Sequence, residues 1–219
     1  MPSPPQDRHG RKPARERTPA HAGARQLRII GGQWRGRRWR FPSGEIRPTP
    51  DRVRETLFNW LQQRVMGARC LDLYAGSGAL GLEALSRGAA QAVFVVRERT
   101  AAQALRTTLG EWQAPDAPER RAQVECTEAT RYLRAALAAV PRPMPFELVF
   151  LDPPYAAVAE LTAVTALLEA GLLRPGAGIY VEHARRDPLP PLPGTWRELR
   201  AGAAGEVGYH LFEAGEGER

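Results

Sequence analysis

Hydrophobic positions along the chain follow two alternating spacings, and this alternation predicts a parallel α/β sheet. Short apolar runs typical of buried strands occur near 69–75, 91–97, 122–127, 146–151 and 176–183. Apolar residues at helical spacing between them predict helices near 78–88, 99–112, 129–139 and 158–171. Strands that alternate with helices favour a doubly wound, mostly parallel sheet. The stretch 195–213 is expected to add an antiparallel edge hairpin around residues 202–205.

The segment before this pattern is of a different kind. In residues 27–41, short apolar runs flank Gly31 and Gly32, which predicts a β-hairpin, and arginine alternates with aromatic residues. Such a hairpin offers charge for phosphates and rings for bases, although the rings are equally able to pack it onto the domain. A helix follows, with Thr49 expected as its N-cap and Pro50 in its first helical position. Its expected core face consists of Val53, Leu57, Trp60, Leu61 and Val65.

The 219 residues suit one domain with a tail, and their charge is unevenly distributed. Residues 1–42 hold 11 Lys and Arg against 2 acids, whereas the remaining residues hold 20 basic and 22 acidic side chains. The excess of basic residues behind the net charge of +7 therefore lies entirely in the N-terminal segment. An arginine-rich arm favours nucleic acid as a partner, because its binding releases condensed counterions. A solvated tail is an equal alternative for residues 1–24, which we expect to be disordered.

Composition also disfavours several classes of protein. No apolar stretch approaches the ~18 residues that cross a membrane, and residues 1–24 lack the apolar centre of a secretory signal. Cys70 and Cys126 lie in apolar surroundings and are expected to be buried, reduced thiols. The 4 histidines are scattered and form no metal-binding spacing with the cysteines. We therefore expect a cytoplasmic protein without a metal ion or a membrane segment.

The strongest chemical signal is Asp152-Pro153-Pro154-Tyr155, which directly follows the apolar run 146–151. Ligands of open α/β sheets bind just past the carboxyl ends of the strands. The two prolines lack N–H donors, so the turn offers the Asp152 carboxylate and the Pro153 carbonyl as acceptors. This arrangement suits a grip on both hydrogens of an exocyclic amino group, with the Tyr155 ring stacked on the base. A proline turn without a chemical role is the alternative.

A glycine loop, Gly76-Ser77-Gly78-Ala79-Leu80-Gly81, follows the first strand of the sheet and opens a helix. The pattern G-x-G-x-x-G is a dinucleotide fingerprint, but the helix N-terminus equally fits the carboxylate of a methionine moiety. Three features favour S-adenosylmethionine. A long arginine-rich segment precedes the motif, Asp72 is placed to meet an ammonium group, and the fourth strand ends in the amino-gripping tetrapeptide. A hydride-transfer enzyme has no need of that tetrapeptide.

Two further acids are candidates for binding the cofactor's adenosine. Glu98 lies ~20 residues beyond the glycines, where the fingerprint expects an acid that bonds the ribose hydroxyls. Glu128 follows the third strand and is placed to accept from the adenine amino group. Each has an ordinary alternative, because acids are common at the starts of helices.

Together these stretches resemble the RsmD-type 16S rRNA (guanine-N2) methyltransferases, from Arg28 to about Phe212. The resemblance is carried by residues 28–36, 47–49, 51–59 and 72–84 and by the tetrapeptide. It implies an α/β, Rossmann-like class I SAM-dependent methyltransferase with a seven-stranded, mostly parallel sheet and an N-terminal β-hairpin extension. It also implies methylation of the N2 amino group of a guanine in 16S rRNA, within an assembled or assembling small ribosomal subunit. Relatives usually carry an acid at Val96, and here the nearest acid is Glu98.

The expected organisation is a disordered basic tail in 1–24, an RNA-binding hairpin and helix in 25–66, and a methyltransferase domain in 67–215, acting as a monomer. The expected catalytic residues are Asp152, Pro153, Pro154 and Tyr155. The expected cofactor-binding residues are Asp72, Ala75, Gly76, Ser77, Gly78, Glu98, Glu128 and Thr49. The expected RNA-binding residues are Arg28, Trp34, Arg35, Arg37, Arg38 and Arg52. The alternatives are a DNA or RNA adenine-N6 amino-methyltransferase, a nucleic-acid-binding protein with a vestigial cofactor fold, and a nicotinamide enzyme.

Overall fold

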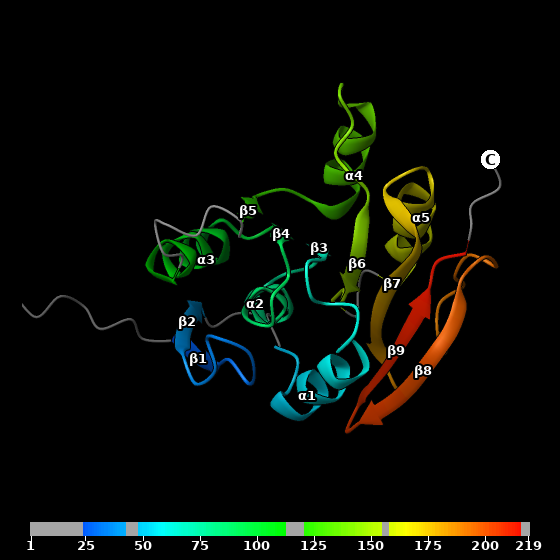
Figure 1. Ribbon diagram of the computed structural model, residues 1–219. Coiled ribbons are helices and arrows are strands. Elements are labelled where there is room, and N and C mark those ends of the chain that lie inside the picture. Colours follow the sequence, from blue (N-terminus) through cyan, green and yellow to red (C-terminus); the bar gives the residue numbers. More distant parts are fainter. Residues whose placement is uncertain (1–23, 43–47, 113–120, 155–157, 216–219) are drawn as a thin grey trace, which may run out of the picture.

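The computed structural model describes residues 24–42, 48–112, 121–154 and 158–215 (Figure 1). The tail up to residue 23 and Tyr155 lie outside these ranges. The main sheet has 7 strands in the order β5-β4-β3-β6-β7-β9-β8. The strands are β3 (Arg69–Asp72), β4 (Gln91–Val95), β5 (Arg121–Glu125), β6 (Phe146–Leu151), β7 (Leu173–Ala184), β8 (Arg197–Ala204) and β9 (Val207–Glu213).

Five strands of this sheet, β3 to β7, pair in parallel, and the hairpin of β8 and β9 pairs antiparallel with β7. The predicted doubly wound sheet with an antiparallel edge hairpin is therefore confirmed. The chain runs outward from β3 to β5, then returns to β6 on the other side of β3. In open α/β sheets, the crevice at such a reversal is where ligands bind.

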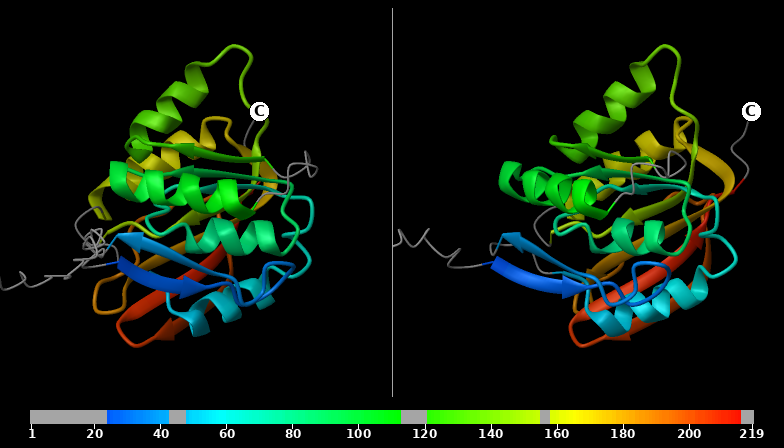
Figure 2. Two further views of the ribbon diagram at one scale, coloured as in Figure 1. Left: turned by 90° about the vertical axis from the view of Figure 1, so that its left-hand side faces the viewer. Right: turned by 60° about the vertical axis from the view of Figure 1, so that its left-hand side comes forward.

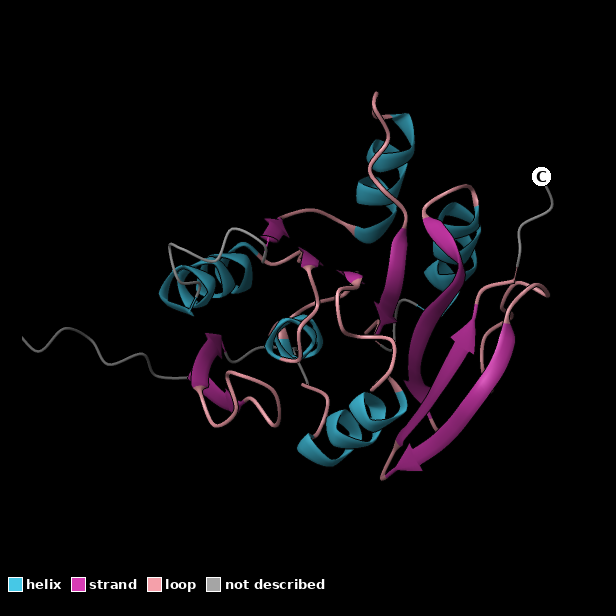
Figure 3. Ribbon diagram, in the orientation of Figure 1, coloured by secondary structure: helices cyan, strands magenta, loops and turns pink. Residues whose placement is uncertain are grey.

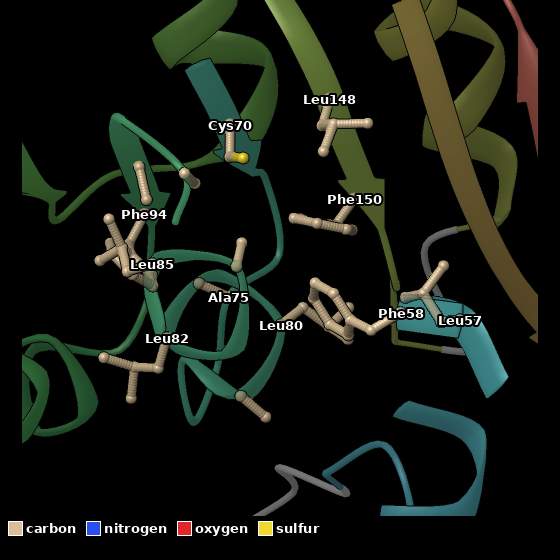
Figure 4. Packing of buried hydrophobic residues seen from close by; sticks show 14 of the residues in the cluster. Leu57, Phe58, Cys70, Ala75, Leu80, Leu82, Leu85, Phe94, Leu148 and Phe150 are labelled. Carbon is tan, nitrogen blue, oxygen red and sulfur yellow. The ribbon is translucent and has the colours of Figure 1, made fainter. Parts of the chain in front are cut away.

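Helices cover both faces of the sheet (Figures 2 and 3). The helices are α1 (Asp51–Trp60), α2 (Ala79–Ser86), α3 (Arg99–Trp112), α4 (Ala129–Ala138) and α5 (Val158–Glu169). Helices α1, α2 and α3 share one hydrophobic cluster with Phe94, Phe150 and Tyr180, whereas α4 and α5 share the other with Val149 and Ile179. Neighbouring strand residues thus point to opposite layers, as the pleat requires. Figure 4 shows Phe58 of α1, Leu80 of α2 and Phe150 of β6 within the first cluster.

Element bounds differ from the predictions mainly at their ends. Strand β3 stops at Asp72, because the backbone already turns at residue 73, and β7 begins three residues earlier than expected, at Leu173. The expected core face of α1 is buried except for Trp60, whose half-buried ring lies 5.5 Å from that of Tyr209. The prediction that Thr49 caps this helix is wrong. Pro50 occupies the N-cap position without a side-chain hydrogen bond, since the helix begins one residue later than expected.

The predicted N-terminal hairpin is present and forms its own small sheet. Strands β1 (Ala24–Arg28) and β2 (Arg38–Pro42) pair antiparallel, and residues 29–37 connect them. The tryptophans of the hairpin point into the molecule, because Trp34 and Trp39 are both buried against Trp112 of α3. The aromatic rings therefore fix the hairpin to the domain, which was one of the two interpretations of the sequence pattern.

Polar contacts to α2 hold the connection of this hairpin in place. The buried Glu83 carboxylate accepts hydrogen bonds from the backbone N–H groups of Ile30 at 2.9 Å and Gly31 at 2.7 Å. The buried guanidinium of Arg54 lies 3.4 Å from the same carboxylate. Gly32 has φ 76°, and a Cβ atom there would lie only 2.0 Å from the carbonyl oxygen of Ser86, so that no other residue fits. The hairpin is thus seated on α2 in one defined position.

Candidate functional site

A cavity of about 780 Å³ opens at the carboxyl ends of β3, β4 and β6, beside the reversal in strand order. Its walls bring together most of the residues that the sequence singled out: Thr49, Asp72, Ala75, Gly76, Ser77, Glu98, Glu128, Asp152, Pro153 and Pro154. Gly78 does not line the wall, but it occupies the N-cap position of α2 with φ 78°. A Cβ atom at Gly78 would lie 2.6 Å from Cδ1 of Leu105, so glycine permits both the turn and the helix packing.

Asp72 ends β3 and lies against the first turn of α2. Its Oδ2 atom accepts a hydrogen bond from the backbone N–H of Gly81 at 2.9 Å, which fixes the carboxyl group beside the glycine loop. Burial raises the pKa of Asp72 to about 7, the Gly81 N–H opposes this shift, and the Asp152 charge adds to it. The hairpin reaches the same loop, because the Trp39 indole N–H donates to the Ser77 carbonyl oxygen at 2.8 Å.

Asp152 directly follows β6, so that its carboxyl group stands at the edge of the sheet as expected. The buried Thr49 hydroxyl donates a hydrogen bond to Asp152 Oδ2 at 3.2 Å. Burial raises the pKa of Asp152 to about 7, and the Thr49 hydroxyl opposes this shift. Thr49 therefore belongs to the site through this hydroxyl and not through a helix cap.

The sequence analysis missed a third buried acid in the same wall, Glu182 of β7. The Tyr180 hydroxyl donates to Glu182 Oε1 at 2.8 Å. Burial first, and then the Asp152 charge, raise the pKa of Glu182 well above its usual value. Tyr74 also lines the cavity, and its hydroxyl is buried with no hydrogen-bond partner among the described residues. The sequence did contain a signal for Glu182. A glutamate at the end of the apolar run Ile179-Tyr180-Val181 is unusual in a buried strand unless its carboxyl group is functional.

The two adenosine candidates are found on loops at the cavity wall. Strand β4 ends at Val95, so the alternating side-chain directions of a strand do not determine where Glu98 points. Val96 and Glu98 nevertheless both line the cavity. Glu98 is exposed and its carboxylate lies 3.2 Å from the Arg97 guanidinium. Glu128 is exposed and occupies the N-cap position of α4 without a side-chain cap hydrogen bond. Both carboxylates are thus accessible to a ligand in the cavity.

The arginines expected to contact RNA lie on the surface. Arg35, Arg37, Arg38 and Arg52 are exposed, and Arg28 is exposed with its Nε atom 2.9 Å from the Asp51 carboxylate. The guanidinium of Arg37 lies 5.8 Å from the centroid of the Trp112 ring. Trp34 was expected in the same group, but its ring is buried and packs on Trp112. The buried Trp34 ring therefore offers no free face on which a base could stack.

Other expectations concern the cysteines, metal ions and membranes. Cys70 is buried as expected, but the expectation that Cys126 is buried is wrong, because that residue is exposed just after the end of β5. Within the described ranges, no group of three or more His, Cys, Asp or Glu side chains is arranged so that it could hold a metal ion. None of the helices in those ranges has the length and apolar character needed to span a lipid bilayer.

Comparisons with known proteins cover nearly the whole described chain. The family model described as Conserved hypothetical protein 95 matches residues 27–213. The Escherichia coli (strain K12) protein named Ribosomal RNA small subunit methyltransferase D is 42% identical over 196 residues, which are 89% of this chain and 93% of that protein. The Haemophilus influenzae protein of the same name is 39% identical over 190 residues, 86% of this chain and 94% of that protein. A solved Escherichia coli structure, described provisionally as a methyltransferase, has a TM-score of 0.76 at 42% identity and covers 87% of this chain and 98% of its own.

Proposed function

This chain belongs to the Conserved hypothetical protein 95 family, which is the family of the RsmD-type resemblance, and we propose that it transfers a methyl group from S-adenosylmethionine to ribosomal RNA. Its fold is the α/β, Rossmann-like class I methyltransferase fold with an N-terminal hairpin extension. The proposed acceptor is the exocyclic N2 amino group of a guanine in 16S rRNA. The observation that carries the proposal is the joint position of the glycine loop and the Asp152 turn in one cavity.

The acids of the cavity fit the charge of this cofactor. Burial raises the pKa values of Asp72, Asp152 and Glu182, and no cationic side chain of the described residues is among the groups that shift them. S-Adenosylmethionine carries a sulfonium and an ammonium group, and a nearby cation favours the ionised form of a carboxyl group. The N-terminus of α2, opened by the glycine loop, suits the cofactor's carboxylate. Glu98 and Glu128 are assigned to the ribose hydroxyls and the adenine amino group.

When bound, the cofactor supplies an electrophilic methyl group on its sulfonium sulfur. The Asp152 carboxylate and the Pro153 carbonyl hold the hydrogens of the guanine amino group and direct its lone pair at that methyl carbon. Since this lone pair is delocalised into the base, holding the nitrogen in a pyramidal geometry is the main task of the protein. With the cofactor bound, the amine nitrogen would take over the methyl group, and Asp152 would take up the surplus amine proton. Positioning of this kind supplies ~7–11 kcal/mol, and a general base adds about 10²–10⁴-fold.

The target guanine must leave its stack to reach this cavity. Tyr155, which lies outside the described residues, is proposed as the ring on which the base stacks. The exposed arginines of the hairpin are proposed to hold the flanking phosphates, because the hairpin is seated directly beside the glycine loop. The proposed substrate is 16S rRNA within an assembled or assembling small subunit.

The proposal is tested with tritiated S-adenosylmethionine and the purified protein. The candidate acceptors are small subunits that lack methylation, free rRNA and duplex DNA, and the labelled nucleoside is identified after digestion. We expect N2-methylguanosine from the rRNA or the subunits, and subunits already treated with unlabelled cofactor serve as the control that takes up no label. Label in N6-methyladenine instead would contradict the guanine assignment and support the adenine alternative, which the same tetrapeptide also serves.

A further inference from the structure

Glu182 lies beside Asp152 because of the register between β6 and β7. Leu151, the last residue of β6, pairs with Val181 in this parallel ladder, so the next residues are Asp152, directly after β6, and Glu182 within β7. Phe150 and Tyr180, two residues earlier, are also partners, and their ring centroids are 6.5 Å apart on the same face of the sheet. Both residues line the cavity, and the Asp152 charge contributes to the raised pKa of Glu182, so the two carboxyl groups lie near each other there.

The Tyr180 hydroxyl orients the Glu182 carboxyl group. The Tyr180 hydroxyl donates to Oε1 at 2.8 Å, and the Tyr180 side chain is only 1% exposed. Glu182 itself is 4% exposed, so its side chain is held by packing as well. A carboxylate accepts through two oxygens, so Oε2 remains able to accept from a ligand while Oε1 is held by Tyr180.

The edge of a base next to its amino group differs between guanine and the other amino-bearing bases. In guanine the N2 amino group is flanked by the N1–H donor, whereas in adenine and cytosine the amino group is flanked by a ring nitrogen that accepts. An enzyme that takes a base out of its stack identifies it by hydrogen bonds along this edge. Two carboxylates side by side offer acceptors only, and therefore match two adjacent donors.

We propose that Glu182 selects guanine by accepting a hydrogen bond from N1–H through Oε2, while Asp152 holds the neighbouring N2 amino group. This inference rests on the proposed function and assigns its base specificity to one residue. A ring nitrogen with a lone pair in place of N1–H is repelled by the carboxylate, so adenine and cytosine are rejected. The sulfonium cation of the cofactor and the two base donors both favour the ionised form of this acid pair.

The substitution Glu182→Gln reverses this recognition without changing the size of the side chain. The Tyr180 hydroxyl donates to Oε1, so the glutamine carbonyl oxygen takes that place and its NH₂ group faces the base. A donor then opposes the N1–H of guanine but suits 2-aminopurine, which keeps the C2 amino group and has an accepting N1. Each mismatched hydrogen bond to such a buried group costs roughly 10- to 100-fold in turnover.

The experiment compares two rRNA substrates, one with the guanine that the wild-type protein labels and one with 2-aminopurine at that position. We expect the wild type to prefer guanine by roughly 10- to 100-fold in kcat/KM, and Glu182→Gln to lose or reverse this preference. Cofactor affinity by calorimetry and the melting temperature show whether the variant is folded. An unchanged preference in a folded variant overturns the inference.

Two further outcomes separate this inference from the proposed function. A wild-type protein that labels guanine at N2 but uses 2-aminopurine equally well leaves the proposed function standing and refutes the role of Glu182, even where the variant does not fold. A wild-type protein that labels neither substrate contradicts the proposed function itself.

Tyr180→Phe keeps the carboxylate but removes the hydroxyl that orients it, so we expect a weakened preference for guanine that does not reverse.

Discussion

At the residue scale, a small number of neighbours determine the orientation and the pKa of the Asp152 carboxyl group. The Thr49 hydroxyl donates to it, Glu182 lies on the next strand, and burial raises its pKa to about 7. Burial thus favours the protonated form of this carboxyl group in the protein alone. A cation bound beside it would favour the ionised form, which is the form that accepts a proton from an amine.

Asp152→Asn keeps the shape of this side chain and removes its ability to take up a proton. We expect turnover to fall by about 10²–10⁴-fold, because the general base is lost while much of the grip on the amino group remains. The affinity for S-adenosylmethionine, measured by calorimetry, is expected to change little. The exposed Glu111 of α3 provides the matched control, since Glu111→Gln makes the same chemical change away from the cavity. Near-wild-type turnover of Asp152→Asn would contradict the proposed role.

The site residues differ in whether they could be predicted from the sequence alone. Asp72 and Asp152 were predictable, because Asp72 lies in an apolar strand, Asp152 directly follows one, and each stands beside a local motif. Glu182 was not, because its nearness to Asp152 depends on the register of two strands rather than on any local spacing. The Thr49 hydroxyl bond to Asp152 joins positions that are 103 residues apart, and no pattern in the sequence announces it.

At the element scale, the N-terminal hairpin has two sides with different tasks. Its tryptophans pack on α3, and its connection is bonded to Glu83 of α2, while its arginines face solvent. Helix α3 was predicted to its exact ends, because its apolar spacing is strong and local. The bonds to Glu83 were not predicted, because a glutamate in a helix usually faces solvent and nothing in the helix itself signals a partner in the hairpin.

Removing charge from the outer side of the hairpin tests its role in RNA binding. For Arg35→Gln combined with Arg38→Gln, we expect weaker RNA binding and a shallower salt dependence. The slope of log K against log salt falls by ~0.7–0.9 for each phosphate that the variant no longer neutralises. Arg37 is left in place because its guanidinium lies over the Trp112 ring.

The control for this experiment is Arg131→Gln combined with Arg134→Gln. Both residues are exposed on α4, which covers the other face of the sheet, so the net charge changes equally. Binding is measured by filter retention or fluorescence anisotropy at several salt concentrations. If both double variants show the same slope as the wild type, the hairpin arginines do not contact phosphates.

At the scale of the whole molecule, the fold buries three carboxyl groups at one end of the sheet. Burial disfavours their ionised forms and therefore raises their pKa values. The fold class and the succession of elements followed from alternating patterns along the chain. The strand order was not predicted, because it is decided by which strands pair across the reversal between β3 and β6. That reversal places Asp72, Asp152 and Glu182, from three neighbouring strands, around one cavity.

This burial of acids predicts how stability depends on pH. The pKa of Asp152 rises from 3.8 to about 7 on folding, so the folded state binds the proton more tightly than the unfolded state between these values. The stabilising contribution of this group is complete below pH 3.8 and is lost as the pH rises through about 7. We therefore expect the wild type to lose stability relative to Asp152→Asn by about 1.4 kcal/mol for each pH unit from pH 5 to about 7, with no further loss from this group at higher pH. Urea unfolding of both proteins across this range measures the difference, and parallel curves would refute it.

The hydrogen bond from the Trp39 indole to the Ser77 carbonyl joins the hairpin that is proposed to bind RNA to the loop that is proposed to hold the cofactor. We expect this contact to couple the binding of the two ligands. Thermodynamic reciprocity then requires that any factor by which the cofactor alters RNA affinity is the factor by which RNA alters cofactor affinity. The spent cofactor has lost the sulfonium charge that the acids around the cavity attract. Under the proposed function, we therefore expect methyl transfer to change the affinity of the hairpin for RNA, so that release of the ribosomal product depends on completion of the reaction.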